Sequence, residues 1–133
     1  MFDDYGHHPV EINAIFDSLK NTYPDKRLVV IFQPHRYSRT RDLFDDFARI
    51  LSQAGSLILL DIYPASETPI AQINSSTLAD SIRKRSTLNP VVIKDIQEVL
   101  NVLPHIIGPN DVLLTLGAGD IHTLPSLLKS NYG

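Results

Sequence analysis

The sequence contains no cysteine, which excludes disulfide bonds and thiolate metal sites. It also has no apolar run near the roughly 18 residues that a membrane-spanning helix needs. The first residues, Met1 to Tyr5, have neither the basic start nor the apolar stretch of a signal peptide. These absences fit a protein of the reducing cytoplasm with no membrane partner.

Positive charge is scarce: the sequence has 12 Lys and Arg residues and 15 Asp and Glu residues, which gives a net charge of −3. A nucleic-acid partner therefore has no overall electrostatic support. Arg36, Arg39 and Arg41, beside His35, form a local exception. A basic spot in a mildly acidic protein favours a small anionic ligand over a polyanion.

The pattern of apolar residues predicts one α/β domain of 133 residues. Strands are expected at 28–32, 56–62, 90–93 and 111–116, with Phe2 as the stub of one more strand. Helices are expected at 9–23, from a Thr40 cap to a stop at Gly55, after Ser75 or Ser76, around 96–103 and over 124–128. This order predicts an open, mostly parallel, Rossmann-like sheet with helices on both faces and right-handed crossovers.

Polar residues gather where the predicted strands end, in segments 3–8, 35–39, 61–67 and 117–120. Open parallel sheets bind ligands beyond the carboxyl ends of their strands. We therefore expect a site at this edge. Asp61 lies there too, and we favour a loop-organising hydrogen-bond acceptor over an acid for it.

Segment 3–9, DDYGHHP, precedes the first predicted helix. One interpretation is a ligand-contacting loop, in which helix N-terminal amides help to hold an anion. The other is an N-cap and turn with solvent-facing polar groups. A metal site is disfavoured because the adjacent His7 and His8 point in divergent directions.

Segment 34–39, PHRYSR, is expected to be a polar loop. The guanidinium groups of Arg36 and Arg39 suit a carboxylate or phosphate. Alternatively, the loop is solvated and pairs with downstream acids, namely Asp42, Asp45 and Asp46. We expect Arg41 to have that second, ordinary surface role.

Segment 116–120, LGAGD, follows the last predicted strand. Gly117 and Gly119 permit close backbone approach to a ligand, but we favour a plain tight turn as their explanation. The third glycine of a dinucleotide fingerprint is missing, and no G-x-x-x-x-G-K-[ST] loop occurs anywhere. The sequence offers no Ser-His-Asp or Cys-His arrangement.

Four segments together resemble the C-terminal, third domain of the Mur ligase family. They are DDYGHHP at 3–9, FQPHRYSRTRDLFDDF at 32–47, DIYPASETPI at 61–70 and LTLGAGDI at 114–121. Their order is that of the family, and the HRYSRT form is similar to members that add L-alanine. Departures from the family pattern are Val10 and Ser38 for threonine, Pro64 for alanine and Ser66 for glycine.

The resemblance implies that residues 1–133 are one part of a three-domain bacterial enzyme of peptidoglycan synthesis. Such enzymes use ATP and Mg²⁺ to phosphorylate the carboxylate of UDP-N-acetylmuramate, and the amine of L-alanine then attacks the acyl phosphate. The first domain holds the UDP-sugar, and the central domain carries the P-loop and metal ligands. The isolated chain is therefore expected to be inactive, with no metal ligands and no tightly bound ATP or Mg²⁺.

The resemblance also implies roles for individual residues. Arg36 and Arg39 match arginines that bind the L-alanine carboxylate and nearby phosphate oxygens. Tyr5 and His7 match residues that line the closed site near the reacting groups and the nucleotide, with His35 beside them. Gly117 and Gly119 shape its rim. All these roles concern positioning and charge neutralisation, so no catalytic residue is expected in the isolated domain.

Three alternatives stay open at this point. A receiver-like signalling domain would use Asp3, Asp4 and Asp61, but it needs a lysine where this chain has Thr115–Gly117. A stand-alone α/β anion-binding module would use the arginines alone. A small hydrolase using His7 or His35 with Asp61 has no identifiable nucleophile.

Overall fold

The computed structural model describes residues 2–4, 8–117 and 120–125, which contain a five-stranded parallel sheet of order β1-β5-β2-β3-β4. The strands are β1 (Phe2–Asp4), β2 (Arg27–Gln33), β3 (Ser56–Leu60), β4 (Val91–Ile93) and β5 (Asp111–Gly117). The expected parallel sheet is confirmed, and so is the extra strand at Phe2. Receivers have strand order 2-1-3-4-5, so the receiver alternative is wrong.

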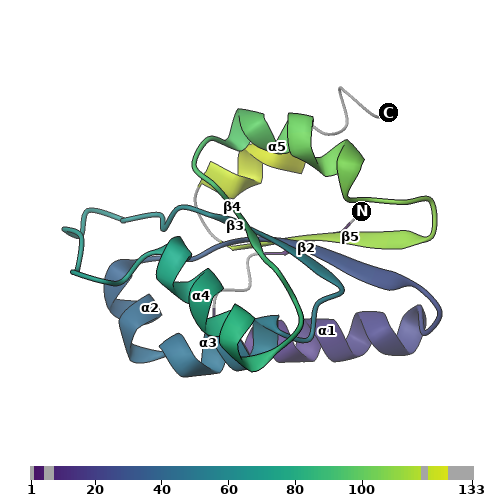
Figure 1. Ribbon diagram of the computed structural model, residues 1–133, viewed down its shortest axis with the longest axis horizontal. Helices are drawn as coiled ribbons and strands as arrows, with labels where there is room; N and C mark the ends of the chain where they lie inside the picture. Colours follow the sequence, from purple (N-terminus) through teal and green to yellow (C-terminus); the bar gives the residue numbers. More distant parts are fainter. Residues whose placement is uncertain (1, 5–7, 118–119, 126–133) are drawn as a thin grey trace.

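Helices cover both faces of the sheet, as expected (Figure 1). One face carries α1 (Pro9–Thr22), α3 (Phe44–Leu51) and α4 (Ser75–Arg85), and the other carries α5 (Ile96–Val102), η1 (Leu103–His105) and η2 (Asp120–Thr123). Side chains alternate along β2, so Val30 and Phe32 enter the first core, whereas Val29 and Ile31 enter the second. Burial on both faces explains the continuous apolar run of this strand.

The prediction of a loop over residues 34–39 is wrong, because α2 (Tyr37–Asp42) begins within this segment. Thr40 is therefore not a helix cap. Its hydroxyl donates to the carbonyl of Arg36 at 2.8 Å from within α2, and Leu43 precedes α3 instead. The sequence YSRTRD is almost entirely polar and gives no apolar periodicity that would indicate a helix.

Other predicted boundaries also shift. Asn74, not Ser75 or Ser76, caps α4, because its Oδ1 accepts a hydrogen bond from the Thr77 amide at 2.8 Å. Strand β3 ends at Leu60, two residues earlier than expected. Helix α3 ends at Leu51, so it does not run to Gly55, and a Cβ at Gly55 would collide with the Arg27 side chain. The predicted last helix begins as η2, while positions 127 and 128 lie outside the described residues.

The starts of β2 and β5 are joined by an ion pair between Arg27 and Asp111. Arg27 donates to Asp111 through Nη2 at 2.7 Å and Nε at 3.2 Å, and the Gly108 amide donates at 2.7 Å. The hydrogen bond from Arg27 lowers the pKa of Asp111 below its ordinary value. The ion pair therefore stabilises the fold while the carboxylate is ionised.

We expect Asp111→Asn to lower the free energy of unfolding by about 1 kcal/mol at neutral pH, because Arg27 is partly exposed and screened. The folded pKa is depressed, so the contribution is complete above the unfolded pKa of about 3.9 and is lost as pH falls through the folded value. Urea unfolding across this range measures it. Asp42→Asn, in an exposed pair with Arg41, is the control. A difference that does not shrink in acid would contradict the assignment.

Candidate functional site

The loops that leave β2 and β3 lie side by side at the carboxyl edge of the sheet. His35 and Tyr63 form a parallel bridge, and the Arg36 amide donates to the Tyr63 carbonyl at 2.8 Å. The Tyr63 amide donates to the Pro34 carbonyl at 2.8 Å, and the rings of His35 and Tyr63 stack with centroids 5.7 Å apart. The pairing of β2 and β3 thus continues past the strands and fixes the loop that carries the arginines.

Arg36 has a backbone conformation that side-chain-bearing residues rarely adopt, with φ 72° and ψ 140°. Such a conformation costs about 1–3 kcal/mol and persists where the surroundings determine it. Its side chain is exposed, and within residues 2–4, 8–117 and 120–125 its guanidinium makes no hydrogen bond or salt bridge. A strained residue therefore presents a cation that is available to a ligand.

Arg39 lies one helical turn later on α2 and is partly buried. Its Nη1 lies 3.2 Å from His35 Nδ1. The structure therefore brings together the side chains of two predicted substrate-binding residues, His35 and Arg39, and places Arg36 between them in the chain.

The acids downstream of the arginine loop do not pair with Arg36 or Arg39 in the described part of the chain. Arg41 pairs with Asp42 at 2.9 Å, which confirms its expected surface role. Asp46 pairs with Arg49 at 3.2 Å, and Asp45 lies 3.9 Å from Arg85. The alternative of a solvated loop paired with these acids therefore fails for Arg36 and Arg39.

Glu67 contacts the arginine loop and was missed from sequence. Its Oε1 accepts from the Ser38 amide at 3.0 Å, and its Oε2 accepts from the Ser38 hydroxyl at 2.5 Å. The hydroxyl bond, followed by the amide bond, lowers the pKa of Glu67, and the nearby charge of Arg36 acts in the same direction. In the sequence, Glu67 is one acidic residue in a loop after an apolar strand. That pattern does not indicate which residue it binds.

Gln33 was also missed as an organiser of the site. This buried side chain donates through Nε2 to the Asp61 carbonyl at 3.3 Å and accepts at Oε1 from the Ile121 amide at 2.9 Å. The acceptor at Asp61 is thus its backbone carbonyl, whereas the predicted role of its side chain, which is exposed, stays a prediction. The sequence feature that could have indicated this role is a glutamine directly after the apolar residues of β2.

Gly117 ends β5 with φ 131°, and a Cβ there would lie 2.5 Å from the Gln33 carbonyl oxygen. Glycine is therefore required here by the close approach of the β5 and β2 backbones, while the rest of the predicted turn lies outside the described residues. His8 caps α1 through Nδ1, which accepts from the Val10 amide at 3.2 Å. The N-cap interpretation thus holds for His8, while Tyr5, His7 and Gly119 lie outside the described residues.

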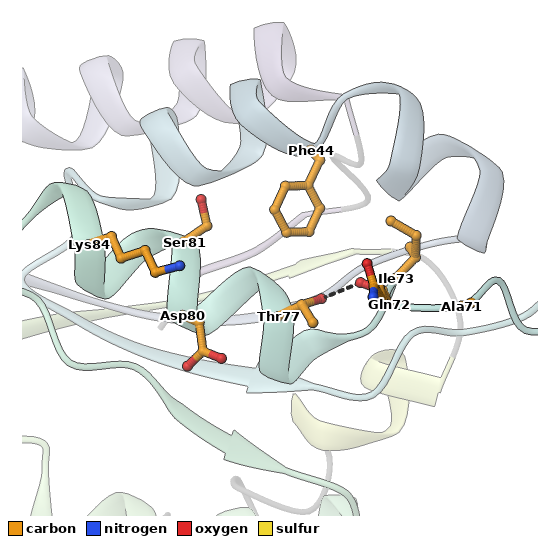
Figure 2. A pocket seen from close by; sticks show the side chains of 8 residues that line it. All are labelled: Phe44, Ala71, Gln72, Ile73, Thr77, Asp80, Ser81 and Lys84. Atoms are coloured by element: carbon orange, nitrogen blue, oxygen red, sulfur yellow. Dashed lines mark hydrogen bonds between the residues drawn. The ribbon is translucent and has the colours of Figure 1, made fainter.

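Two hollows lie near α4. One of about 330 Å³ adjoins the arginine loop and is lined by Tyr37, Asp61, Ile62, Asn74, Ser75, Ser76 and Lys94. Figure 2 shows the other, of about 590 Å³, which is lined by Phe44, Ala71, Gln72, Ile73, Thr77, Asp80, Ser81 and Lys84. Neither of these two hollows is lined by Arg36 or Arg39.

The described residues, 2–4, 8–117 and 120–125, lack two further kinds of feature. They include no cluster of three His, Cys, Asp or Glu placed to hold a metal ion. They also include no helix that is long and apolar enough to cross a membrane.

Comparison with known proteins gives consistent matches at both the sequence and the structural level. The family model described as "Mur ligase, glutamate ligase domain" matches residues 1–119. The chain is 75% identical over 132 residues to the UDP-N-acetylmuramate–L-alanine ligase of Vesicomyosocius okutanii, and 49% identical over 131 residues to that of Methylococcus capsulatus. These matches cover 99% and 98% of this chain, but only 28% of each relative.

Solved structures give the same result for the fold. The UDP-N-acetylmuramate–alanine ligase of Thermotoga maritima matches with a TM-score of 0.76 and 26% identity, covering 97% of this chain and 25% of that one. A domain from a putative Haemophilus ducreyi ligase matches with a TM-score of 0.70 and 19% identity, covering 98% of this chain and 89% of that one. The second likeness concerns the fold alone.

Proposed function

Because the chain belongs to the Mur ligase C-terminal domain family, we propose that it is the third domain of a UDP-N-acetylmuramate–L-alanine ligase. The chain spans 28% of the length of the curated relatives it matches, so the activity belongs to the longer protein. The observation that carries the proposal is the pair Arg36 and Arg39, held at the carboxyl edge without acidic partners in the described chain. The same proposal places the protein in bacterial cytoplasmic peptidoglycan synthesis.

The role we assign to Arg36 and Arg39 is to bind the carboxylate of L-alanine. A guanidinium donates two parallel hydrogen bonds to a carboxylate, which fixes orientation as well as position. Holding the carboxylate leaves the amine free to point at its target carbon, and such orientation lowers the barrier of a bimolecular step. His35, at 3.2 Å from Arg39, supports the second guanidinium.

The described residues do not fit ATP or Mg²⁺. No phosphate-cradling P-loop occurs in the sequence, and the described residues include no cluster of three His, Cys, Asp or Glu placed to hold a metal ion. We therefore propose that ATP, which supplies the activating phosphoryl group, and Mg²⁺ are held by the central domain of the longer protein, and UDP-N-acetylmuramate by its first domain. Tyr5, His7, Gly117 and Gly119 are proposed to line the site when these domains close.

The test is to assay the full-length protein encoded by the native reading frame and the 133-residue chain in parallel. We expect the full-length protein to form UDP-N-acetylmuramoyl-L-alanine with release of ADP and phosphate, and the chain alone to form none. Reactions without L-alanine report background ATP hydrolysis, and calorimetry measures ATP binding to the chain. An inactive full-length protein, or tight Mg-ATP binding by the chain, would contradict the proposal.

A further inference from the structure

We propose that Glu67 is a positioning residue for the amino-acid substrate, because its carboxylate fixes the backbone segment that presents Arg36 and Arg39. This inference rests on the proposed function and deepens it. It adds a residue from the loop after β3, a different part of the chain from the arginine loop. Glu67 touches neither the substrate nor the reacting atoms in this proposal.

Ser38 binds both oxygens of the Glu67 carboxylate, and the backbone of Tyr37 also hydrogen-bonds this group. Ser38 donates its amide to Oε1 at 3.0 Å and its hydroxyl to Oε2 at 2.5 Å. Two hydrogen bonds between the same pair of residues fix the orientation of Ser38 as well as its distance. Ser38 lies between Arg36 and Arg39 in the first turn of α2, so this orientation sets the direction in which both guanidinium groups leave the helix.

The strain at Arg36 needs such a constraint. A residue at φ 72° relaxes unless its neighbours determine its conformation. The Arg36 amide is held by the Tyr63 carbonyl, and its carbonyl accepts from the Thr40 hydroxyl at 2.8 Å. The Thr40 amide also donates to that carbonyl, at 3.2 Å. Glu67 adds a further restraint through Ser38, so its loss allows Arg36 to move toward an ordinary conformation and changes the direction of its guanidinium.

The charge of Glu67 does not neutralise Arg36 by contact. Both carboxylate oxygens are engaged by Ser38, and the described residues include no salt bridge between Glu67 and an arginine. The negative charge acts on Arg36 only through space. Glu67 therefore holds the arginine loop while its arginines stay available to the carboxylate of a ligand.

The experiment compares Glu67→Leu, Glu67→Gln, Ser38→Ala and Ser38→Thr in the full-length protein. Leucine removes both acceptors, whereas glutamine retains a carbonyl for the Ser38 amide and an NH₂ group that donates to the Ser38 hydroxyl. We expect Glu67→Leu to raise KM for L-alanine about tenfold and Glu67→Gln to stay within about threefold of wild type. Ser38→Ala should raise KM about threefold, and Ser38→Thr, which keeps both donors, should match wild type.

The KM values for ATP and UDP-N-acetylmuramate serve as internal references and should change less than about twofold. Glu98→Leu, the same change at an exposed position on α5, is the control for general effects. Equal increases in all three KM values, or a KM for L-alanine equal to that of Glu98→Leu, would overturn the inference. If Glu67→Leu does not fold, Ser38→Ala decides, because an unchanged KM for L-alanine there also overturns it. An inactive wild-type enzyme would instead refute the proposed function.

Discussion

Replacing Arg36 with alanine should raise KM for L-alanine about 100-fold in the full-length protein, because two charge-assisted hydrogen bonds to the carboxylate are lost. Replacing it with glycine should weaken binding equally. The two variants should differ in stability, however, because Arg36 has φ 72° and glycine adopts this conformation without strain. We expect the free energy of unfolding of Arg36→Gly to be about 1 kcal/mol higher than that of Arg36→Ala.

Arg41 provides a control in which the stability order reverses. It lies within α2 and pairs with Asp42 at the surface, and it is absent from the positive-φ residues. Glycine within a helix is less stable than alanine by about 1 kcal/mol, so Arg41→Gly should be less stable than Arg41→Ala. Neither Arg41 variant should change KM for L-alanine.

Steady-state kinetics and urea unfolding measure these two effects separately. If Arg36→Gly were no more stable than Arg36→Ala, the strain at this position would not exist. If the two Arg36 variants kept the wild-type KM, the carboxylate would be bound elsewhere. The two substitutions thus distinguish the effect of the Arg36 backbone on stability from the effect of its guanidinium on binding of L-alanine.

The sheet was predictable from sequence because its central strands are buried on both faces. Leu28–Phe32 and the run at 56–60 contain only apolar residues apart from Ser56, and burial on two faces requires this pattern. Helix α2 was not predictable in the same way, because it buries only Thr40 and has no apolar stripe. Its start depends on a contact from Glu67, 29 residues away from Ser38.

The candidate site was predictable to the extent that chemistry follows residue type. Two arginines beside a histidine at a strand end indicate an anion site whatever the exact backbone. The supporting residues were not predictable, because Gln33 and Glu67 act through partners that only the folded chain brings near. The conformation of Arg36 was hidden for a related reason, since arginine has no preference for positive φ and tertiary contacts impose it.

Gly117→Ala should lower the free energy of unfolding by about 2–4 kcal/mol, the largest loss of stability expected here. Alanine at φ 131° is strained, and its Cβ would lie 2.5 Å from the Gln33 carbonyl oxygen. The colliding atom belongs to the backbone of a central strand, so a side-chain rotation cannot relieve the contact. The expected response is a separation of the ends of β5 and β2.

Gly108→Ala is the matched control. A Cβ there would meet only Asp111 Oδ2, at an ordinary 3.5 Å, and Gly108 has no positive φ. This substitution should change the free energy of unfolding by less than about 1 kcal/mol. Urea unfolding of both variants gives the comparison, and equal stabilities would show that the close approach at Gly117 is relieved without cost.

Gly117→Ala should also disturb the arginine loop, because it displaces Gln33. The side chain of Gln33 connects the part-buried Asp61 carbonyl to the buried Ile121 amide, so a displaced Gln33 leaves both backbone groups without this partner. Asp61 begins the loop that contains Tyr63 and Glu67, the residues that hold Arg36 and Ser38. The folded Gly117→Ala variant of the full-length protein should therefore also have a higher KM for L-alanine. An unchanged KM would show that the contact between Gly117 and Gln33 contributes to stability but not to binding of L-alanine.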